Sequence, residues 1–297
     1  MSYSPVVDEV AVASAAIGLL TRDVGLAGTI WRDPVTDFAR KKNETVSVYL
    51  PAYAVANKRS LRANATRVRT ALKERKVDVV LENDLQVDVP LTDENQTLDT
   101  RSIVTDVSAP SIGAIVRAYD EEVADVMQST DTESAIDWDE SDGGAYATLV
   151  DADLALTDHQ VPATGRHLLV GTNRVRQLRN ENLLVAANTS GSTQALRNGD
   201  LGAVAGFERV MTSPFIDPDF AIAYHTTAWA LCSRAPVVPD GVAWGNVQSS
   251  NGFAIRVMQH LTQDDQKDLL NIVFHDSWFG ISPVTDDGAI NENGVFI

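Results

Sequence analysis

Two stretches with alternating apolar and polar residues limit what this chain can fold into more than any other feature. Residues 45–50 read TVSVYL, and residues 77–91 read VDVVLENDLQVDVPL. A period of two residues is typical of β-strands with one buried face. The connecting residues 54–75, AVANKRSLRANATRVRTALKER, contain neither Gly nor Pro. The pattern therefore predicts a β-hairpin with a long, basic connection.

The length of this hairpin depends on how the second stretch pairs. With arms over about 45–60 and 76–91, each arm would be roughly 50 Å long at about 3.3 Å per residue. A compact chain of this size has a radius of gyration of about 19 Å, so such a hairpin would project beyond its own subunit. The alternative is that the second stretch folds back onto the main sheet, with Asn83-Asp84 as a turn.

The hairpin region differs in charge from the rest of the chain. The 297 residues include 24 Lys and Arg against 41 Asp and Glu, a formal charge of −17. Residues 40–76 hold eleven Lys or Arg against two Glu, which gives +9; subtracting this from −17 leaves −26 for the other 260 residues. The acidic total disfavours a protein that neutralises nucleic acid over its whole surface.

The basic segment has three interpretations: a solvated loop, a nucleic-acid contact, or docking on an acidic surface. Only Tyr49 and Tyr53 supply aromatic rings for stacking on single strands, whereas identical copies of the chain offer a strongly acidic surface. We therefore favour a homo-oligomer in which the hairpin reaches across a neighbouring copy. The residues expected at this contact are Lys58, Arg59, Arg62, Arg67, Arg69, Lys73 and Arg75.

Two helices are predicted from apolar residues at helical spacing. The first is an amphipathic N-terminal helix that docks in its own subunit or in a neighbour, with Val6, Val10, Ala13, Ile17, Leu20 and Val24. The second is a long helix with a single apolar stripe formed by Ile112, Val116, Tyr119, Val123 and Val126. We expect Ser108 to cap this second helix and Pro110 to lie in its first turn.

The rest of the chain predicts an α+β fold. We expect helices at 146–158 and 173–181, and strands at 166–171, 221–234, 253–259 and 271–284. The acidic stretch 131–144 lacks the ligand spacing of a calcium loop, so we interpret it as a solvated linker or helix-capping loop. The tail after Pro283 reads as an acidic loop with an apolar end.

No group of residues indicates catalysis, a metal site or a cofactor. The five His lack the spacing of a helical metal pair, and we expect His275 to lie in the core. Gly199, Gly202 and Gly206 fit neither a dinucleotide nor a phosphate loop, and predict a turn that leads Phe207 into a strand. The single cysteine, Cys232, excludes an intrachain disulfide and reads as a buried apolar residue. No window is long and apolar enough to span a membrane.

The order of these segments resembles that of the major capsid proteins of tailed bacteriophages, whose fold is shared with encapsulins. The segments that carry the resemblance are 29–51, 77–99, 107–126, 163–181 and 190–213, followed by the strands at 253–259 and 271–284. The resemblance implies an N-terminal arm (1–43), an extended β-hairpin loop (44–91) and a peripheral domain with a spine helix (92–135). It further implies an axial α/β domain (136–250), then closing peripheral strands and a tail (251–297).

The same resemblance implies a structural protein that is not an enzyme. It would assemble as pentamers and hexamers into an icosahedral shell that encloses double-stranded DNA without sequence-specific binding. We expect a portal and a separate scaffolding protein as partners, a virion location, and assembly in the cytoplasm of a host bacterium, with no membrane. Crosslinking through Lys58 or Lys73, which some relatives perform through Lys–Asn bonds, is not expected.

Two other functions stay open at this point. An encapsulin-type nanocompartment would use the same fold to hold a cargo protein. An acidic α/β enzyme would have a site whose residues are scattered along the sequence, and a pocket with clustered carboxylates would indicate it.

Overall fold

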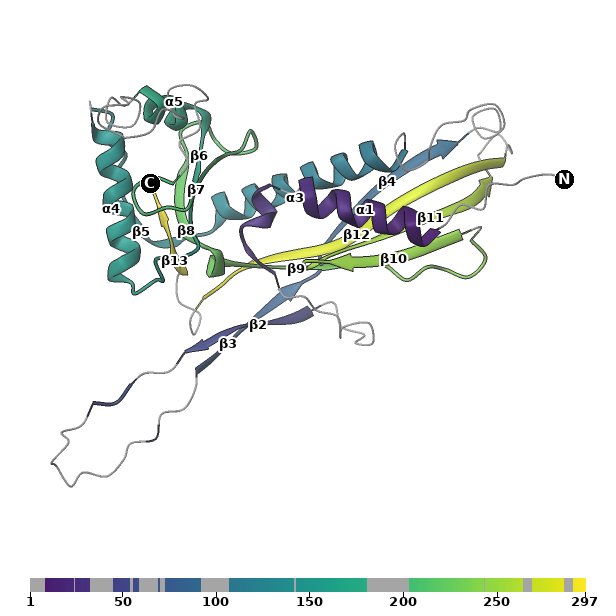
Figure 1. Cartoon of the computed structure of the whole chain (residues 1–297), viewed down its shortest axis with the longest axis horizontal. Coiled ribbons are helices and arrows are strands. Elements are labelled where there is room, and N and C mark those ends of the chain that lie inside the picture. The colour runs from purple at the N-terminus through teal and green to yellow at the C-terminus, as the bar shows by residue number, and fades with distance from the viewer. Residues whose placement is uncertain are drawn as a thin grey trace.

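The computed structural model describes residues 9–23, 25–32, 45–53, 56–58, 69, 73–91, 107–141, 143–180, 203–242, 244–263, 269–285 and 291–297. Two β-sheets lie side by side along the molecule, and a hairpin projects from the region between them (Figure 1). The described helices are α1 (Glu9–Asp23), α3 (Ala109–Ser129), α4 (Gly144–Asp158) and α5 (Thr172–Asn180), with short turns η1 (Leu26–Gly28) and η4 (Thr226–Ala228). Within these residues, no helix is long and apolar enough to cross a membrane.

The larger sheet, called the large sheet here, is built around one long strand. Its order is β1 (Trp31–Arg32), β9 (Trp229–Arg234), β12 (Leu269–Pro283), β11 (Phe253–Gln263) and β10 (Trp244–Ser250). The first part of β12 pairs with β11 and its last part with β9, while β4 (Asn83–Leu91) pairs along its other side. The prediction of strands at 253–259 and 271–284 is confirmed.

Helices α1 and α3 cover one face of the large sheet. The predicted stripe of α3 is buried at Ile112, Val116, Tyr119 and Val123, with Val126 partly buried. Helix α1 packs on α3, β10 and β11, so the N-terminal helix docks in its own subunit. Its buried face does not include Val10, which is 50% exposed.

Ser108 does not cap α3 as the sequence predicted. Its backbone is helical (φ −71°, ψ −37°) and its side chain makes no capping hydrogen bond. A capping residue needs extended backbone angles to direct its oxygen at the first free N–H groups. The Ser108 hydroxyl instead lies 3.1 Å from Nε2 of the buried His275. Pro110 lies in the first turn, as expected.

The second sheet, called the small sheet, has the order β5 (Thr132–Ala135), β13 (Asn291–Phe296), β8 (Ala221–His225), β6 (Arg166–Val170) and β7 (Arg209–Thr212). The predicted strand at 166–171 and the helices α4 and α5 are confirmed. The acidic stretch and the tail were predicted as loops, but they contain β5 and β13, which pair with each other. Their short polar sequences become strands because each finds a partner that is remote in sequence.

The predicted strand 221–234 is two strands in two different sheets. Residues 226–228 form the turn η4, after which the chain passes from β8 in the small sheet to β9 in the large sheet. The Nδ1 atom of His225 accepts a hydrogen bond from the backbone of Thr227 and holds this turn. The apolar run is continuous because both halves are buried, so its periodicity does not reveal the break.

Sheet pairing divides the chain differently from the five predicted ranges. β9 and β10 fall in 136–250 but belong to the large sheet, and β13 falls in 251–297 but belongs to the small sheet. The predicted ranges, as domains, stay a prediction.

The two sheets are joined by polar contacts as well as by chain crossings. The hydroxyl groups of Tyr224 in β8 and Thr29 beside η1 are 2.6 Å apart. The Gln128 side chain near the end of α3 donates to the backbone oxygen of Phe215 and accepts from the backbone N–H of Asp217. These contacts tie α3 and the N-terminal segment to the small sheet.

The predicted turn before Phe207 is confirmed in its described part. Val204 and Phe207 exchange both backbone hydrogen bonds around Ala205 (φ 49°) and Gly206 (φ 89°). A Cβ atom on Gly206 would lie 2.6 Å from the carboxylate of Asp153. That carboxylate pairs with the buried Arg166, so the glycine leaves room for an ion pair in the small-sheet core.

Candidate functional site

The hairpin predicted from the alternating stretches is present but shorter than expected. β2 (Thr45–Tyr53) pairs with β3 (Lys73–Val80) in an antiparallel register that places Thr45 opposite Val80. The predicted arm 76–91 is wrong, because the chain leaves the ladder at Leu81-Glu82 and β4 joins the large sheet against β12. The alternative, in which this stretch folds onto the main sheet, is correct for β4, although β4 begins at Asn83-Asp84 instead of turning there.

The base of the hairpin is anchored on its own large sheet. Its inner face consists of buried Val46, Val48, Val77 and Val79, which pack against Ala230, Cys232 and Val284. Cys232 is buried, as predicted. A Cβ atom on Gly280 of β12 would lie 1.9 Å from the backbone oxygen of Val80. The absence of a side chain at Gly280 is therefore what allows the hairpin to approach the sheet this closely.

The outer face of the hairpin is exposed and polar. Tyr49 is 56% exposed, and its register partner is Lys76. Ser47 donates a 2.7 Å hydrogen bond to the Asp78 carboxylate, and the Lys76 ammonium lies 3.0 Å from the same group. These two neighbours hold the pKa of Asp78 below its ordinary value. Exposed ion pairs of this kind contribute little to stability, so this face is free for other roles.

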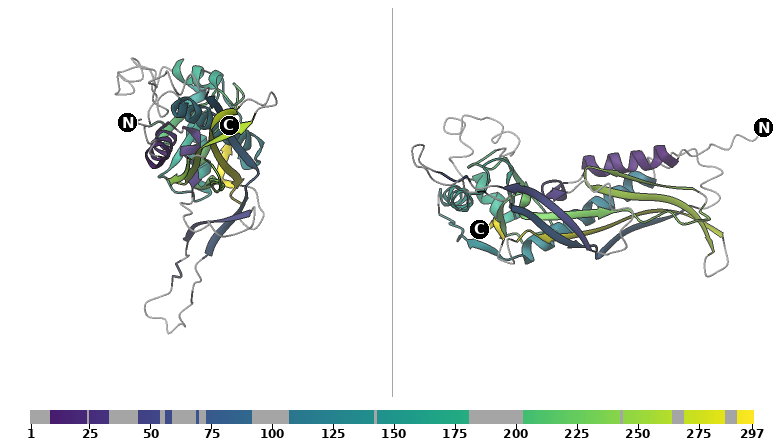
Figure 2. Two further views of the ribbon diagram at one scale, coloured as in Figure 1. Left: turned by 90° about the vertical axis from the view of Figure 1, so that its right-hand side faces the viewer. Right: turned by 90° about the horizontal axis from the view of Figure 1, so that it is seen from below.

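The predicted contact residues lie on and beyond this hairpin. Lys58 and Arg69 are exposed, and Lys73 and Arg75 belong to β3. Arg59, Arg62 and Arg67 lie outside the described residues. The strands β2 and β3 point away from both sheets (Figures 1 and 2). Of the predicted contact residues, Lys73 and Arg75 thus lie in a strand of the projecting hairpin, and the contact with a neighbour stays a prediction.

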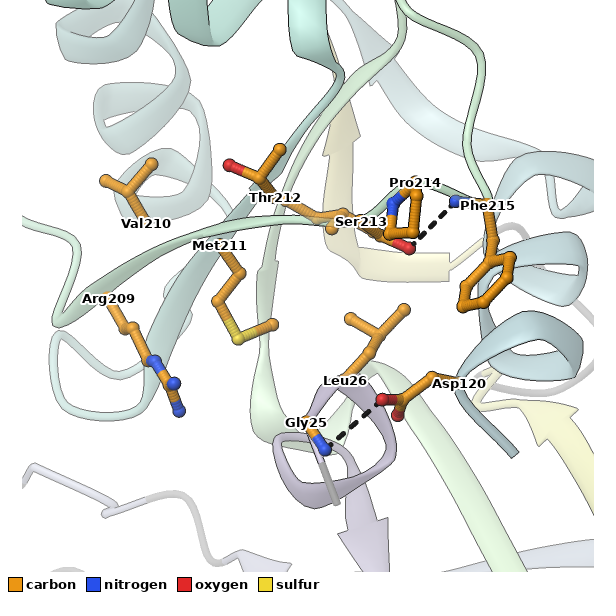
Figure 3. A pocket seen from close by; sticks show the side chains of 11 residues that line it. Gly25, Leu26, Asp120, Arg209, Val210, Met211, Thr212, Ser213, Pro214 and Phe215 are labelled. Atoms are coloured by element: carbon orange, nitrogen blue, oxygen red, sulfur yellow. Dashed lines mark hydrogen bonds between the residues drawn. The ribbon is translucent and has the colours of Figure 1, made fainter. Parts of the chain in front are cut away.

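A cleft of about 260 Å³ lies where η1, α3 and β7 meet (Figure 3). Its carboxylate, Asp120 of α3, accepts hydrogen bonds from the backbone N–H groups of Gly25 (3.3 Å) and Ala27 (2.9 Å). Burial raises the pKa of Asp120, and these hydrogen bonds partly oppose the rise. Arg209 is the other ionisable lining residue. The arrangement fixes the N-terminal segment on α3 and lacks the clustered carboxylates that an acidic enzyme would need.

The histidines and acidic residues form no metal site within the described parts of the chain. His275 is fully buried, and burial lowers its pKa to about 4. In the acidic stretch, the Asp139 carboxylate accepts a hydrogen bond from the backbone of Ser141 just before α4. The residue at the N-cap of α4 is Gly143, and no side chain caps the helix there, so the prediction of a helix-capping loop is wrong for α4.

Known proteins match this chain in fold, whereas comparisons of sequence found no match. No family model matches the chain, and no curated protein matches it. A chain of Mycobacterium phage Che8 is 20% identical and superposes with a TM-score of 0.61, covering 92% of this chain and 90% of that chain. A chain of the capsid of Ralstonia phage GP4 is 11% identical with a TM-score of 0.57, covering 93% and 89%. The chain has the phage major capsid fold.

The capsid fold is not restricted to phage structures among these matches. A virus-like particle from Pyrococcus furiosus gives 12% identity and a TM-score of 0.53, covering 97% of each chain. In all three matches the coverage includes most of both chains, so the resemblance read from the order of segments is confirmed for the fold as a whole.

One feature of the exposed surface was not predicted from the sequence. Within the stretch 77–91, Asp84 and Asp88 are exposed on one side of β4, and Glu82 is exposed just before it. The alternation itself contained the signal, because an exposed strand face with acids and no base is unusual. The basic residues of the neighbouring segment 40–76 dominate the charge pattern of this part of the sequence.

Proposed function

We propose that this protein is the structural subunit of a viral shell and not an enzyme. The observation that carries the proposal is the combination of a helix-covered sheet, a second sheet and a projecting basic hairpin, matched over about nine tenths of the chain by phage structures. The base of the hairpin packs on its own sheet, but the outer face of β2 and β3 is exposed. We infer that this exposed face contacts another molecule.

In the proposed shell, copies assemble as pentamers and hexamers into an icosahedral capsid. The capsid encloses double-stranded DNA without reading its sequence, which suits a chain of net charge −17, because an acidic wall does not bind phosphates strongly. The partners are other copies of the chain, a separate scaffolding protein and a portal. The protein then belongs to the virion and assembles in the cytoplasm of a host bacterium.

Electron microscopy of the purified protein, alone and with a candidate scaffolding protein, tests this proposal. The expected result is closed shells, or rings of five and six subunits. A protein that stays monomeric under every assembly condition would overturn it.

An encapsulin-type compartment is the second candidate, favoured by the match with the Pyrococcus furiosus particle over 97% of each chain. The contents of particles isolated from cells separate the two functions. Packaged double-stranded DNA supports the viral shell, and particles that co-purify with one enzyme and contain no DNA support the compartment.

A further inference from the structure

The small sheet ends in an open edge at β7. β7 pairs with β6 in a parallel register that places Met211 opposite Leu169, and no other described strand pairs with it. In a parallel pair, every second residue of a strand directs its backbone N–H and C=O groups toward the partner strand. The residues between them direct theirs to the open side of β7, where these groups are available to an extended chain.

The cleft of about 260 Å³ lies against this edge strand. All four residues of β7 line it, and Leu26 of η1 and Phe215 add apolar walls (Figure 3). Met211 packs in the core formed with α3 and η1, whereas Val210 on the opposite face of the strand packs against the small-sheet core. Because side chains alternate between the faces of a sheet, a strand added beyond β7 would direct every second side chain toward the cleft.

Arg209 gives the cleft an available positive charge. It is exposed, it lies on the same face of β7 as Met211, and it makes no hydrogen bond or ion pair with another described residue. Asp120 also lines the cleft, but its carboxylate already accepts hydrogen bonds from Gly25 and Ala27. The Arg209 guanidinium is therefore suited to bind a carboxylate from another molecule. A charge on an edge strand also disfavours pairing with the same edge of a second copy.

The size of the cleft distinguishes between two kinds of ligand. Pockets that enclose a drug-sized molecule begin at roughly 300 Å³, and this cleft is smaller. It suits one large apolar side chain of a ligand whose main part is held elsewhere. The open backbone groups of β7 can hold that main part, because an extended peptide binds a sheet edge through its own backbone.

We propose that β7 and its cleft bind an extended peptide segment of a partner protein, which adds a sixth strand to the five-stranded small sheet. One large apolar side chain of the segment enters the cleft beside Met211. An Asp or Glu two positions along the segment pairs with Arg209, because residues two apart in a strand lie on one face. The inference goes beyond the proposed shell function and does not depend on it.

Two capped, fluorescein-labelled peptides of equal composition and charge test this inference on the purified, unassembled full chain. In Glu-Thr-Leu-Thr-Glu the apolar and acidic side chains share one face of a strand in either chain direction, whereas in Thr-Glu-Leu-Glu-Thr they lie on opposite faces. Fluorescence anisotropy should show about fivefold tighter binding of the first peptide. Equal affinities, or no binding of either peptide at millimolar concentration, would overturn the inference.

Charge reversal at Arg209 tests the predicted ion pair. Arg209→Glu should bind Glu-Thr-Leu-Thr-Glu about tenfold more weakly and should instead bind Lys-Thr-Leu-Thr-Lys. Arg209 is exposed, so the melting temperature should not change. The matched control is Arg176→Glu, which reverses an exposed arginine on α5 and should bind like the wild type. If Arg209→Glu binds the acidic peptide as tightly as the wild type does, Arg209 is not the partner and the inference fails.

Hydrogen exchange locates the bound peptide. Backbone amides of β7 should exchange more slowly when Glu-Thr-Leu-Thr-Glu is bound, while those of β5, at the other edge of the same sheet, should not change. Unchanged exchange at β7 would place the peptide elsewhere and overturn the inference. If every amide of β7 is already protected before the peptide is added, the edge is occupied within the chain itself, and the inference is also wrong.

Discussion

The hydroxyl group of Tyr119 lies 2.6 Å from that of Ser277 and joins the middle of α3 to β12 inside the core. Ser233 of β9 lies 2.9 Å from the same hydroxyl, and Ser277 donates to the backbone oxygen of Ala254 in β11. The Tyr119 ring packs between Phe253 and Phe279. One side chain thus ties the long helix to three strands.

Replacing Tyr119 by Phe should lower the free energy of unfolding by about 1 to 2 kcal/mol, because the buried Ser277 hydroxyl and the partly buried Ser233 hydroxyl each lose a partner while the ring packing is kept. Tyr119→Ala should cost about 3 to 5 kcal/mol, since it also leaves a cavity. Urea unfolding of unassembled subunits measures both. Tyr49→Phe is the control, because Tyr49 is exposed on the hairpin. Equal stability of Tyr119→Phe and the wild type would contradict the role assigned to this network.

The subunit should lose stability in mild acid through His275. Burial lowers the pKa of this side chain to about 4, whereas an unfolded histidine has a pKa of about 6.5. Between about pH 6.5 and pH 4, His275 is protonated in the unfolded state but not in the folded state. The free energy of unfolding therefore falls over this interval. The loss between pH 7.5 and pH 5 should be about 2 kcal/mol.

The His275→Gln variant should show a flatter dependence of unfolding free energy on pH over the same interval. Unfolding in urea at pH 7.5 and pH 5 provides the comparison. If the variant keeps the full wild-type slope, another group is responsible for the acid sensitivity.

Gly280→Ala should displace the hairpin base. The new methyl group would meet the backbone oxygen of Val80, which cannot move aside as a flexible side chain can. We expect a loss of about 1 to 3 kcal/mol and weaker assembly. Gly113→Ala on α3 is the matched control, because a Cβ atom there meets nothing within 4 Å, and it should be neutral or slightly stabilising. Thermal melting measures the loss of stability, and light scattering measures assembly. If Gly280→Ala melts and assembles like the wild type, the close contact between Gly280 and Val80 does not hold the hairpin base in place.

The triple variant Arg59→Glu/Arg62→Glu/Arg67→Glu should assemble less well than the wild type, and the difference should be larger at low salt, where repulsion is less screened. Arg176→Glu/Arg179→Glu on the exposed side of α5 provides a control that reverses charge elsewhere. Light scattering at several salt concentrations measures assembly. Normal assembly of the triple variant would show that these hairpin residues make no intersubunit contact.

The local sequence was sufficient to predict helices and strands that have one apolar face. The stripe of α3 and the alternation of β2, β11 and β12 were readable because each has one buried face. The strands β5, β10 and β13 were missed because what makes them strands is a distant partner. The break at Thr226–Ala228 was hidden by burial on both sides of it.

The candidate site was predictable only in part, for the same reason. The charge of residues 54–72 is a property of composition and needs no structure. Trp278 of β12 and Asp84 of β4 are far apart in sequence and become neighbours only through strand register. Register between remote strands depends on the whole fold, so no local pattern could place these residues together.

The hairpin base also sets an order of events during synthesis. Val46, Val48, Val77 and Val79 are made well before β9 and β12, the strands that bury them. Until β9 and β12 have been synthesised, these valines have no sheet to pack on and are exposed to other incomplete chains. The small sheet is also incomplete until late in synthesis, because β13 is its strand between β5 and β8 and is near the end of the chain. Productive folding of this subunit therefore depends on protecting an early hairpin until late strands arrive, which makes high local concentrations of unfinished chains a hazard.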